Sequence, residues 1–519
     1  MEIDTHLSPD AYWTRLRFTR KAVGSLLMLL AVAQVFAFYP GYLSHDSAYQ
    51  WWQARTGNIS TLWPPGMIVL LAAVERLSES SGPTVLYVLH SATYWFSAIV
   101  FATCMQSRRG VVLVAALFAV CPAAWICLPH VWTDVELMAL LMLVVALQVI
   151  ATRTSKRLAL AALAFTFLIL AYAAIVRHNA VFALLPLCAC SVWLRERLNA
   201  PQVSTRRNWP RVAAFTTLIM VGIALFQQAV LRWVPTSRSD TWAITLIWDL
   251  QALSVATHQV LVPRSISPDA TVDDLIASYN PLNAVTLYVL SKRTWANSTI
   301  GLTSTQKSDL TDAWLAAVKA HPRDYLRHRL LVFRKMIGPK RDEARDGGAN
   351  EPLRVAFRDN PVFAFNHPWA LTAAQHWVTF IKPYWLGSGA VWIALSSLAA
   401  AAALRWRRGT SPELATSASG AAFVDMPELA LCHTRLVQGI ALATLLSGIS
   451  YLLPLFFISP TADLRYALWP TLACLMAAAL AWHECWPWHV RPNRKGLRRN
   501  YFGVAPFAAI RARNVSNAS

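Results

Sequence analysis

The chain has 519 residues, of which 56% are hydrophobic and only 14% are charged. A soluble domain carries roughly 25% charged residues, and long apolar runs fit a bilayer better than a water-soluble core, so the composition excludes a set of ordinary soluble domains. The formal net charge of +20 has two explanations: nucleic-acid binding, or the excess of Lys and Arg on the cytoplasmic side of membrane proteins.

The first apolar run covers 22–39 and follows four basic residues between positions 15 and 21. It is too long for the core of a signal peptide and no small-residue cleavage pattern ends it, so we interpret it as an uncleaved first span. The next run, 64–74, begins after Trp63 with a Pro-Pro pair and is too short to cross ~30 Å of hydrocarbon at ~1.5 Å per residue. We expect it to lie in the membrane interface.

Nine further runs follow, and with the first they predict an all-α integral membrane protein of about ten transmembrane helices. The nine are 84–105, 111–128, 135–151, 158–176, 180–194, 212–231, 385–404, 436–458 and 466–483. None of the eight cysteines belongs to a C-x-x-C pair. The sequence therefore predicts neither a disulfide framework nor a cysteine metal site.

The positions of the charges decide the sidedness. With a cytoplasmic N-terminus and 64–74 in the interface, the short outer loops contain only Arg55, Arg76, Arg177 and Arg465, and the other short loops are strongly basic. If 64–74 crossed the bilayer, every later loop would change sides and the bias would reverse. We therefore expect a multi-pass protein of the bacterial inner membrane with both termini in the cytoplasm. This topology explains the net charge without a nucleic-acid partner.

The same topology divides the chain into four parts. They are a transmembrane module of seven spans at 1–231, an extracytoplasmic helical loop domain at 232–384, three C-terminal spans with a short outer loop at 385–483, and a basic cytoplasmic tail at 484–519. In the loop domain, 308–320 predicts an amphipathic helix, and Pro322 can open a second helix. The expected apolar side of that second helix consists of Leu326, Leu330, Phe333 and Ile337.

Two acidic residues stand at the outer ends of spans, at the same expected depth. Asp46 follows the first span and Asp134 follows the third. Ionisable groups in such positions are costly and suggest function. The two carboxylates could share a divalent cation such as Mg²⁺ or Mn²⁺, or one could act as a base while the other orients it. The alternative is that each caps a helix. His45 and His130 flank the pair, either as substrate-binding residues or as interfacial polar residues.

The final outer loop reads Ser459-Pro-Thr-Ala-Asp-Leu-Arg465-Tyr466. An arginine at this depth can extend to the lipid headgroups, or it can bind a phosphate with two parallel hydrogen bonds. Arg177, at the break between two spans, has the same two options. A phosphate-bearing lipid places its charge at this depth, so we expect Arg465, Arg177 and Tyr466 to bind substrate.

The order of these features resembles the GT-C superfamily of membrane glycosyltransferases, especially the bacterial branch similar to the protein mannosyltransferase and aminoarabinose transferase families. In that branch an acidic residue stands in the first outer loop, a Pro-Pro pair opens an interfacial helix, and a second acidic residue follows the third span. Asp46, Pro64-Pro65 and Asp134 match these positions in order, and the 463–466 segment resembles the late Arg-Tyr element of several members. The Ser44-His45 context of the first acidic residue departs from the family pattern.

The resemblance implies an inverting glycosyltransferase with a polyprenyl-phosphate sugar donor and an extracytoplasmic glycan, lipid or protein acceptor. Carried over, Asp46 is the catalytic carboxylate and Asp134 orients it or helps to hold the cation. Arg465, with Arg177 as the second choice, neutralises the leaving phosphate. The alternatives are a transporter or lipid-linked glycan flippase, and a polysaccharide ligase or polymerase. Transporters typically contain inverted repeats, and this sequence contains no evident repeat.

Overall fold

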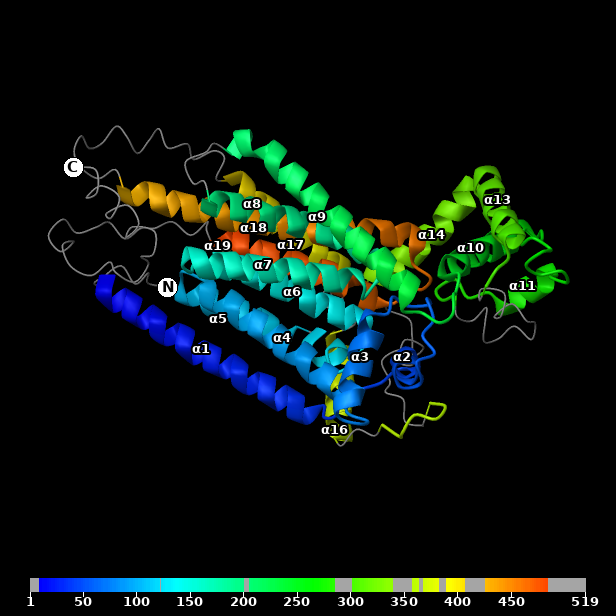
Figure 1. The fold of residues 1–519 in the computed structure, drawn as a ribbon, viewed down its shortest axis with the longest axis horizontal. Helices are drawn as coiled ribbons and strands as arrows, with labels where there is room; N and C mark the ends of the chain where they lie inside the picture. Colours follow the sequence, from blue (N-terminus) through cyan, green and yellow to red (C-terminus); the bar gives the residue numbers. More distant parts are fainter. Residues whose placement is uncertain are drawn as a thin grey trace.

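The computed structural model describes residues 9–121, 123–199, 205–284, 301–338, 357–363, 367–381, 389–406 and 425–483. Within these residues the chain is helical, without strands, and extended segments meet only in three isolated bridges. Ten of the described helices form an elongated bundle (Figure 1). They are α1 (Pro9–Ala37), α4 (Gly82–Cys104), α5 (Arg108–Val120), α6 (Thr133–Ala151), α7 (Lys156–Ala174), α8 (Val181–Asn199), α9 (Thr205–Trp233), α17 (Gly389–Trp406), α18 (Asp425–Ile458) and α19 (Leu468–His483).

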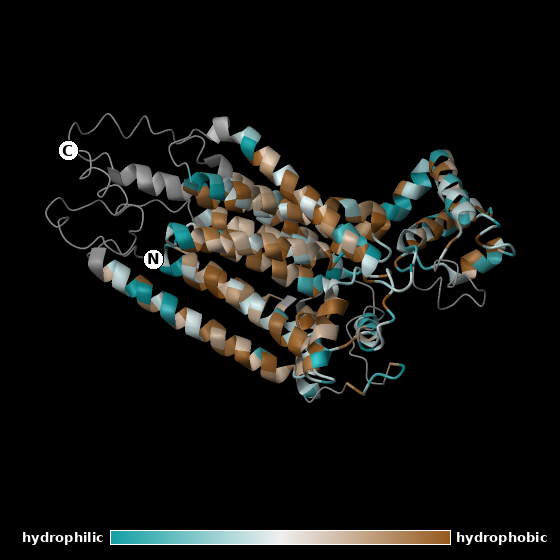
Figure 2. Ribbon diagram, in the orientation of Figure 1, coloured by the Kyte–Doolittle hydropathy of each residue, from teal (hydrophilic) through white to brown (hydrophobic). Residues whose placement is uncertain are grey.

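Seven helices among the described residues are long and apolar enough to cross a membrane, which confirms the prediction of an all-α membrane protein. Helices α8, α17 and α19 coincide with three further predicted runs but do not meet that requirement, so the number of ten spans stays a prediction. Hydrophobic residues dominate the middle of the bundle (Figure 2). Large apolar side chains also point outward: Leu29 of α1 is 67% exposed and Leu218 of α9 is 66% exposed. Such a surface suits lipid rather than water.

Two short helices, α2 (His45–Thr56) and α3 (Gly66–Leu77), lie at one end of the bundle, which we call the loop end (Figure 1). Helix α3 contains most of the short run 64–74, and it lies at the loop end instead of running through the bundle. The amide of Gly66 donates to the carbonyl of Ile175, beyond the end of α7, at 2.7 Å. A Cβ atom on Gly66 would stand 2.6 Å from that oxygen. Only glycine permits this close approach, which fixes the start of α3.

The loop end also contains three short helical turns and one further helix. The turns are η1 (Ala123–Cys127), η2 (His178–Ala180) and η6 (Leu464–Ala467), and the helix is α16 (Pro368–Ile381). Ala370 and Leu371 of α16 are buried in one cluster with Phe38 and Tyr42 of the first loop. The end of the predicted loop domain therefore packs against the bundle.

The described part of the inserted segment forms a small helical domain that extends beyond the loop end (Figure 1). Its helices are α10 (Thr241–Thr257), α11 (Val272–Ser278), α13 (Ser304–Ala320) and α14 (Pro322–Ile337). The predicted helix over 308–320 is confirmed. It begins at Ser304 because Thr303 and Gln306 form a reciprocal capping box. The second helix begins at Pro322, as the sequence predicts.

The predicted apolar side of α14 is wrong at Leu326 and Leu330. Leu326 and Leu330 are 51% and 57% exposed, whereas Arg329 is completely buried. The guanidinium Nη2 of Arg329 lies 2.6 Å from Oδ1 of Asp249 in α10. A buried charge needs a hydrogen-bonded partner of opposite sign, and this requirement sets the rotation of α14 against its leucine pattern.

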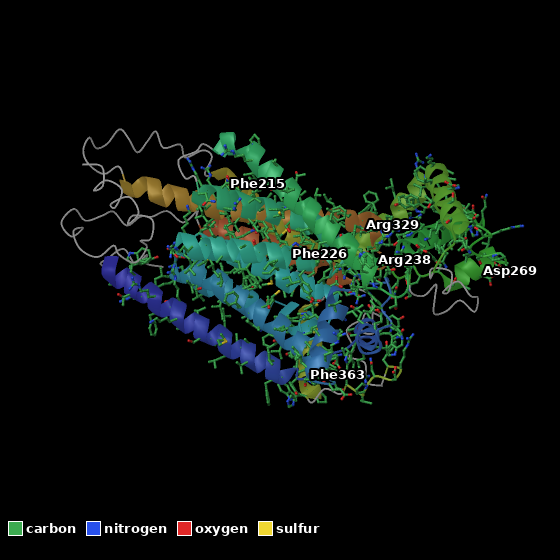
Figure 3. All side chains as sticks on the ribbon, in the orientation of Figure 1. Phe215, Phe226, Arg238, Asp269, Arg329 and Phe363 are labelled. Carbon is green, nitrogen blue, oxygen red and sulfur yellow. The ribbon has the colours of Figure 1, made fainter. Side chains whose placement is uncertain are left out.

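Arg329 also joins the inserted domain to the last loop. Its Nη1 donates to the carbonyl of Ser459 at 2.8 Å, and the indole of Trp314 donates to Asp249 Oδ2 at 3.0 Å. Figure 3 labels Arg329 at the junction between the bundle and the domain. The buried ion pair therefore supports the loop that ends in η6.

Backbone hydrogen bonds connect the same domain to two distant parts of the chain. Residues 282–284 exchange two such bonds with residues 460–462, with N···O distances of 2.8 and 2.9 Å. Residues 59–61 of the first loop bond in the same way to residues 236–237. The inserted domain thus contacts both the first and the last loop.

We expect Asp249→Asn and Arg329→Met each to destabilise the inserted domain by about 3–5 kcal/mol, because either change leaves one buried charge without its partner. The measurement is the rate of limited proteolysis within 241–338 on purified protein. The double variant Asp249→Leu/Arg329→Met should be more stable than either single variant, since both charges are then absent. Asp273→Asn on exposed α11 is the control. Equal resistance in all variants would contradict the role given to this ion pair.

Candidate functional site

Arg465 lies among three carboxylates at the loop end. Its Nη2 is 3.0 Å from Asp46 Oδ2, and its Nε is 3.2 Å from Asp463 Oδ2 and 3.9 Å from Asp134 Oδ2. These residues come from the first loop, the start of α6 and the last loop. The structure therefore brings together the two acidic residues and the arginine that the sequence analysis selected.

Asp463 holds the backbone that presents Arg465. It is the N-cap of η6, and its carboxylate accepts a hydrogen bond from the amide of Arg465 at 3.0 Å. The side chain of Asp463 therefore contacts both the backbone and the guanidinium of Arg465. Asp463 was not predicted as a site residue, although its position two residues before Arg465 is a signal of this local motif.

Arg177 is the second guanidinium of the site. Its Nη1 pairs with Asp134 Oδ2 and lies 3.4 Å from the hydroxyl of Thr133. The guanidinium carbons of Arg177 and Arg465 both lie over the ring of Tyr466, at 5.1 and 5.4 Å from the ring centroid. Tyr466 therefore holds the two cations at fixed positions through cation–π contacts.

The surroundings keep the Arg465 guanidinium charged. Burial acts to lower its pKa, but the neighbouring groups raise the pKa well above the ordinary arginine value. These groups are Tyr466, Asp463, Asp46 and Asp134. Opposite charges at this distance favour the ionised form.

The first loop and the segment before α6 are connected by backbone pairing. The amide of Tyr42 donates to Pro129 O at 2.8 Å, and the amide of Val131 donates to Tyr42 O at 3.0 Å. The indole of Trp132 donates to Ser44 Oγ at 2.9 Å. These bonds bring the starts of α2 and α6 side by side, each with an aspartate in its first turn.

Neither aspartate serves as a helix cap. The N-cap of α2 is Ser44, which forms a capping box with Ser47, and the N-cap position of α6 is Trp132. The carboxylates of Asp46 and Asp134 instead point to guanidinium groups. The capping alternative is therefore wrong for both residues.

The two histidines have different surroundings. His130 is 1% exposed, and its ring stacks on Trp132 at 4.1 Å, while Arg465 lies over the same indole at 5.4 Å. His45 is exposed, and its ring contacts the edge of Phe357 at 4.7 Å. His130 thus borders the Arg465 site through Trp132, whereas His45 faces the 357–363 segment.

Glu136 is a buried acid that the sequence analysis missed. It lies two residues after Asp134, and Tyr172 of α7 donates its hydroxyl to Glu136 Oε1 at 2.5 Å. The same hydroxyl lies 3.4 Å from Gly66 O. The two acids in the first turn of an otherwise apolar helix were the available signal. Glu136 links α6 and α7 to the start of α3.

The donor set does not fit a resident Mg²⁺ or Mn²⁺ ion. In the described part of the chain, no group of three or more His, Cys, Asp or Glu residues is arranged to hold a metal. The Oδ2 atoms of Asp46 and Asp134, which the sequence analysis assigned to a shared cation, both face Arg465. A guanidinium therefore occupies the position expected for the ion.

We expect Asp46→Asn and Arg465→Met to be coupled in stability, because the two side chains are in direct contact. For this partly exposed pair the interaction term of a double-mutant cycle should be about 1 kcal/mol. Thermal unfolding of the four proteins in one detergent gives the term. The pair Asp46→Asn with Arg323→Met, an exposed residue of α14, should be additive. Additivity in both cycles would refute the contact.

Comparison of the chain with protein-family models, with curated proteins and with solved structures found no match. No relative therefore bears on the resemblance to the GT-C superfamily, which stays a prediction. The chemistry of this site rests on its own residues: three carboxylates and two guanidinium groups at one end of an apolar helical bundle.

Proposed function

We propose that this chain is an inverting membrane glycosyltransferase of the GT-C type, which transfers a sugar from a polyprenyl-phosphate donor to an extracytoplasmic acceptor. The observation that carries the proposal is the placement of Arg465 beside Asp46, at the end of an apolar bundle. A lipid phosphate needs a cation at the edge of the hydrocarbon, and the attacking hydroxyl needs a base.

The far end of the bundle supports the proposed sidedness. Arg20 donates to Met105 O at 2.6 Å, and Arg153 donates to Cys104 O at 2.8 Å, both at the end of α4. Arg108, the first residue of α5, donates to Thr19. Basic residues concentrated at one end indicate the cytoplasmic side. The loop end is then extracytoplasmic, in a bacterial inner membrane.

The ion pairs suggest how the donor activates the base. In this state Arg465 is already paired with carboxylates, and the Asp46 side chain is the most accessible of them at 38% exposure. The phosphodiester of the donor carries one negative charge, as a carboxylate does; it accepts two parallel hydrogen bonds from the guanidinium, and the released polyprenyl phosphate gains further charge. The donor phosphodiester can therefore replace Asp46 on Arg465, and Asp46 becomes free to accept a proton.

The transfer then follows in one step. The acceptor oxygen attacks the anomeric carbon and loses its proton to Asp46, while the bond between the anomeric carbon and the phosphate oxygen breaks. The electron pair of that bond stays on the phosphate, where Arg465 stabilises the charge. Attack opposite to the leaving group inverts the anomeric configuration. Asp134 acts as a positioning residue, because it contacts Arg177 and Arg465.

Topology can be tested with reporter fusions. Fusions at Gly110, Lys156 and Gly409 should report the cytoplasm, and fusions at Ser298 and Pro460 should report the outside. Paired alkaline phosphatase and fluorescent-protein reporters in cells measure both states. A cytoplasmic result at Ser298 would contradict the assignment of the site to the extracytoplasmic face.

Asp46→Asn should reduce transfer by about 10²–10⁴-fold, the usual contribution of a general base. The same variant should bind polyprenyl phosphate at least as tightly as the wild type, because Arg465 loses a competing carboxylate. Transfer from short-chain polyprenyl-phosphate hexoses and pentoses is measured as released polyprenyl phosphate, and binding is measured by calorimetry.

The control for this experiment is Asp273→Asn, on the exposed surface of α11, which should change neither quantity. Full activity of Asp46→Asn would refute its role as the base. Weaker phosphate binding by this variant would refute the exchange on Arg465.

A further inference from the structure

A cationic and aromatic surface lies one helical turn from Asp46. It consists of Arg358 and four half-buried rings, those of Tyr49, Trp52, Trp63 and Phe357. The guanidinium carbon of Arg358 lies 4.1 Å from the ring centroid of Trp52 and 4.7 Å from that of Tyr49. Such contacts orient a guanidinium but leave its N–H edges available.

The N–H groups of Arg358 are available for hydrogen bonding to a ligand. It is exposed, and among the residues that the structure describes it forms no hydrogen bond and no ion pair. The neighbouring carboxylate of Asp359 is also exposed and does not pair with it. A guanidinium carries five N–H groups in a planar fork that suits carboxylate and phosphate.

The backbone of this segment is held in an uncommon conformation. Arg358 has a φ of +54°, in the left-handed region that side-chain-bearing residues rarely adopt. Neighbouring contacts maintain it: Asn360 Nδ2 donates to Ala48 O of α2 at 2.9 Å, and Arg55 Nη1 donates to Asp359 O at 3.0 Å. Strain that is maintained by surrounding contacts is typical of ligand sites.

The surface is adjacent to the proposed base. Residues three apart on a helix are neighbours on its surface, so Tyr49 stands beside Asp46 on α2. The ring of His45 meets the edge of Phe357 at 4.7 Å on the same side of the helix start. A group bound to Arg358 and the aromatic rings would therefore lie within one sugar unit of the reacting centre.

We infer that Arg358 with Tyr49, Trp52 and Trp63 binds an anionic saccharide, and that this saccharide is the acceptor. Because Arg358 lies over the rings of Tyr49 and Trp52, the apolar face of a pyranose would pack by dispersion on the neighbouring ring of Trp63, and its carboxylate or phosphate accepts hydrogen bonds from Arg358. The role of this saccharide as the acceptor rests on the proposed function, whereas the binding of an acidic sugar at this surface does not.

The test is saturation-transfer NMR on the full chain in phosphatidylcholine nanodiscs, with glucuronate and glucose as probes. Glucuronate should bind in preference to glucose. Arg358→Met should weaken glucuronate binding about tenfold, because a charged hydrogen-bonded contact is lost. Arg358→Lys should recover part of the affinity, since it keeps the charge but not the fork. Arg323→Met, an exposed arginine of the inserted domain, should bind like the wild type.

Two further arms separate the alternatives. Glucuronate binding should persist in phosphatidylglycerol nanodiscs; its loss there would mean that lipid headgroups occupy the site, and would overturn the proposal. Equal binding by wild type and Arg358→Met, with unchanged melting temperatures, would overturn it too. If wild type binds glucuronate but transfers no sugar, the proposed function fails and this site stands.

Discussion

The arrangement of the loop end depends on the ion pairs that the guanidinium of Arg465 forms. Three carboxylates from distant parts of the chain approach it, and without a cation their mutual repulsion would keep them apart. Asp46 and Asp134 are each in the first turn of a helix, so their pairing with one arginine also sets how α2 and α6 begin relative to each other. The geometry of the catalytic proposal and the local stability of the loop end thus come from the same contacts.

The inserted domain supports this centre from the side. In its buried Asp249–Arg329 pair, Arg329 also donates a hydrogen bond to the carbonyl of Ser459. Its 282–284 segment forms backbone hydrogen bonds with the residues just before Asp463. A second connection, from residues 236–237, reaches the first loop at 59–61. Because one small domain contacts both loops, a displacement of that domain would shift the Arg465 loop relative to the first loop.

Hydropathy and charge were sufficient to predict much of this arrangement. The apolar runs predicted the helices of the bundle, and sidedness alone placed Asp46, Asp134, Arg177 and Arg465 at one end. Their order in the sequence did not show that Arg465 would lie between the two carboxylates, where a metal ion was expected. That detail depends on contacts across more than three hundred residues.

Other features escaped prediction for a related reason. The rotation of α14 follows a buried ion pair, and a periodicity argument treats Arg329 as a surface residue. Glu136 was overlooked because its partner, Tyr172, is on another helix. The direction of His45 depends on Phe357, which comes back to the loop end after helices α10 to α14. In each case the outcome depends on a long-range contact whose partner the local sequence pattern does not identify.

The origin of Arg465 in the last helical hairpin has a consequence for biosynthesis. The pair of Asp134 with Arg177 can form once the first two hundred residues have left the ribosome and entered the membrane, but Arg465 lies between α18 and α19, which are made only after the whole inserted segment. The first loop must therefore wait, with Asp46 unpaired by Arg465, through the insertion of most of the chain. The contacts around Arg465 form only when this segment packs against the bundle, so a nascent chain that stalls before that point lacks the arginine that joins Asp46 to Asp134.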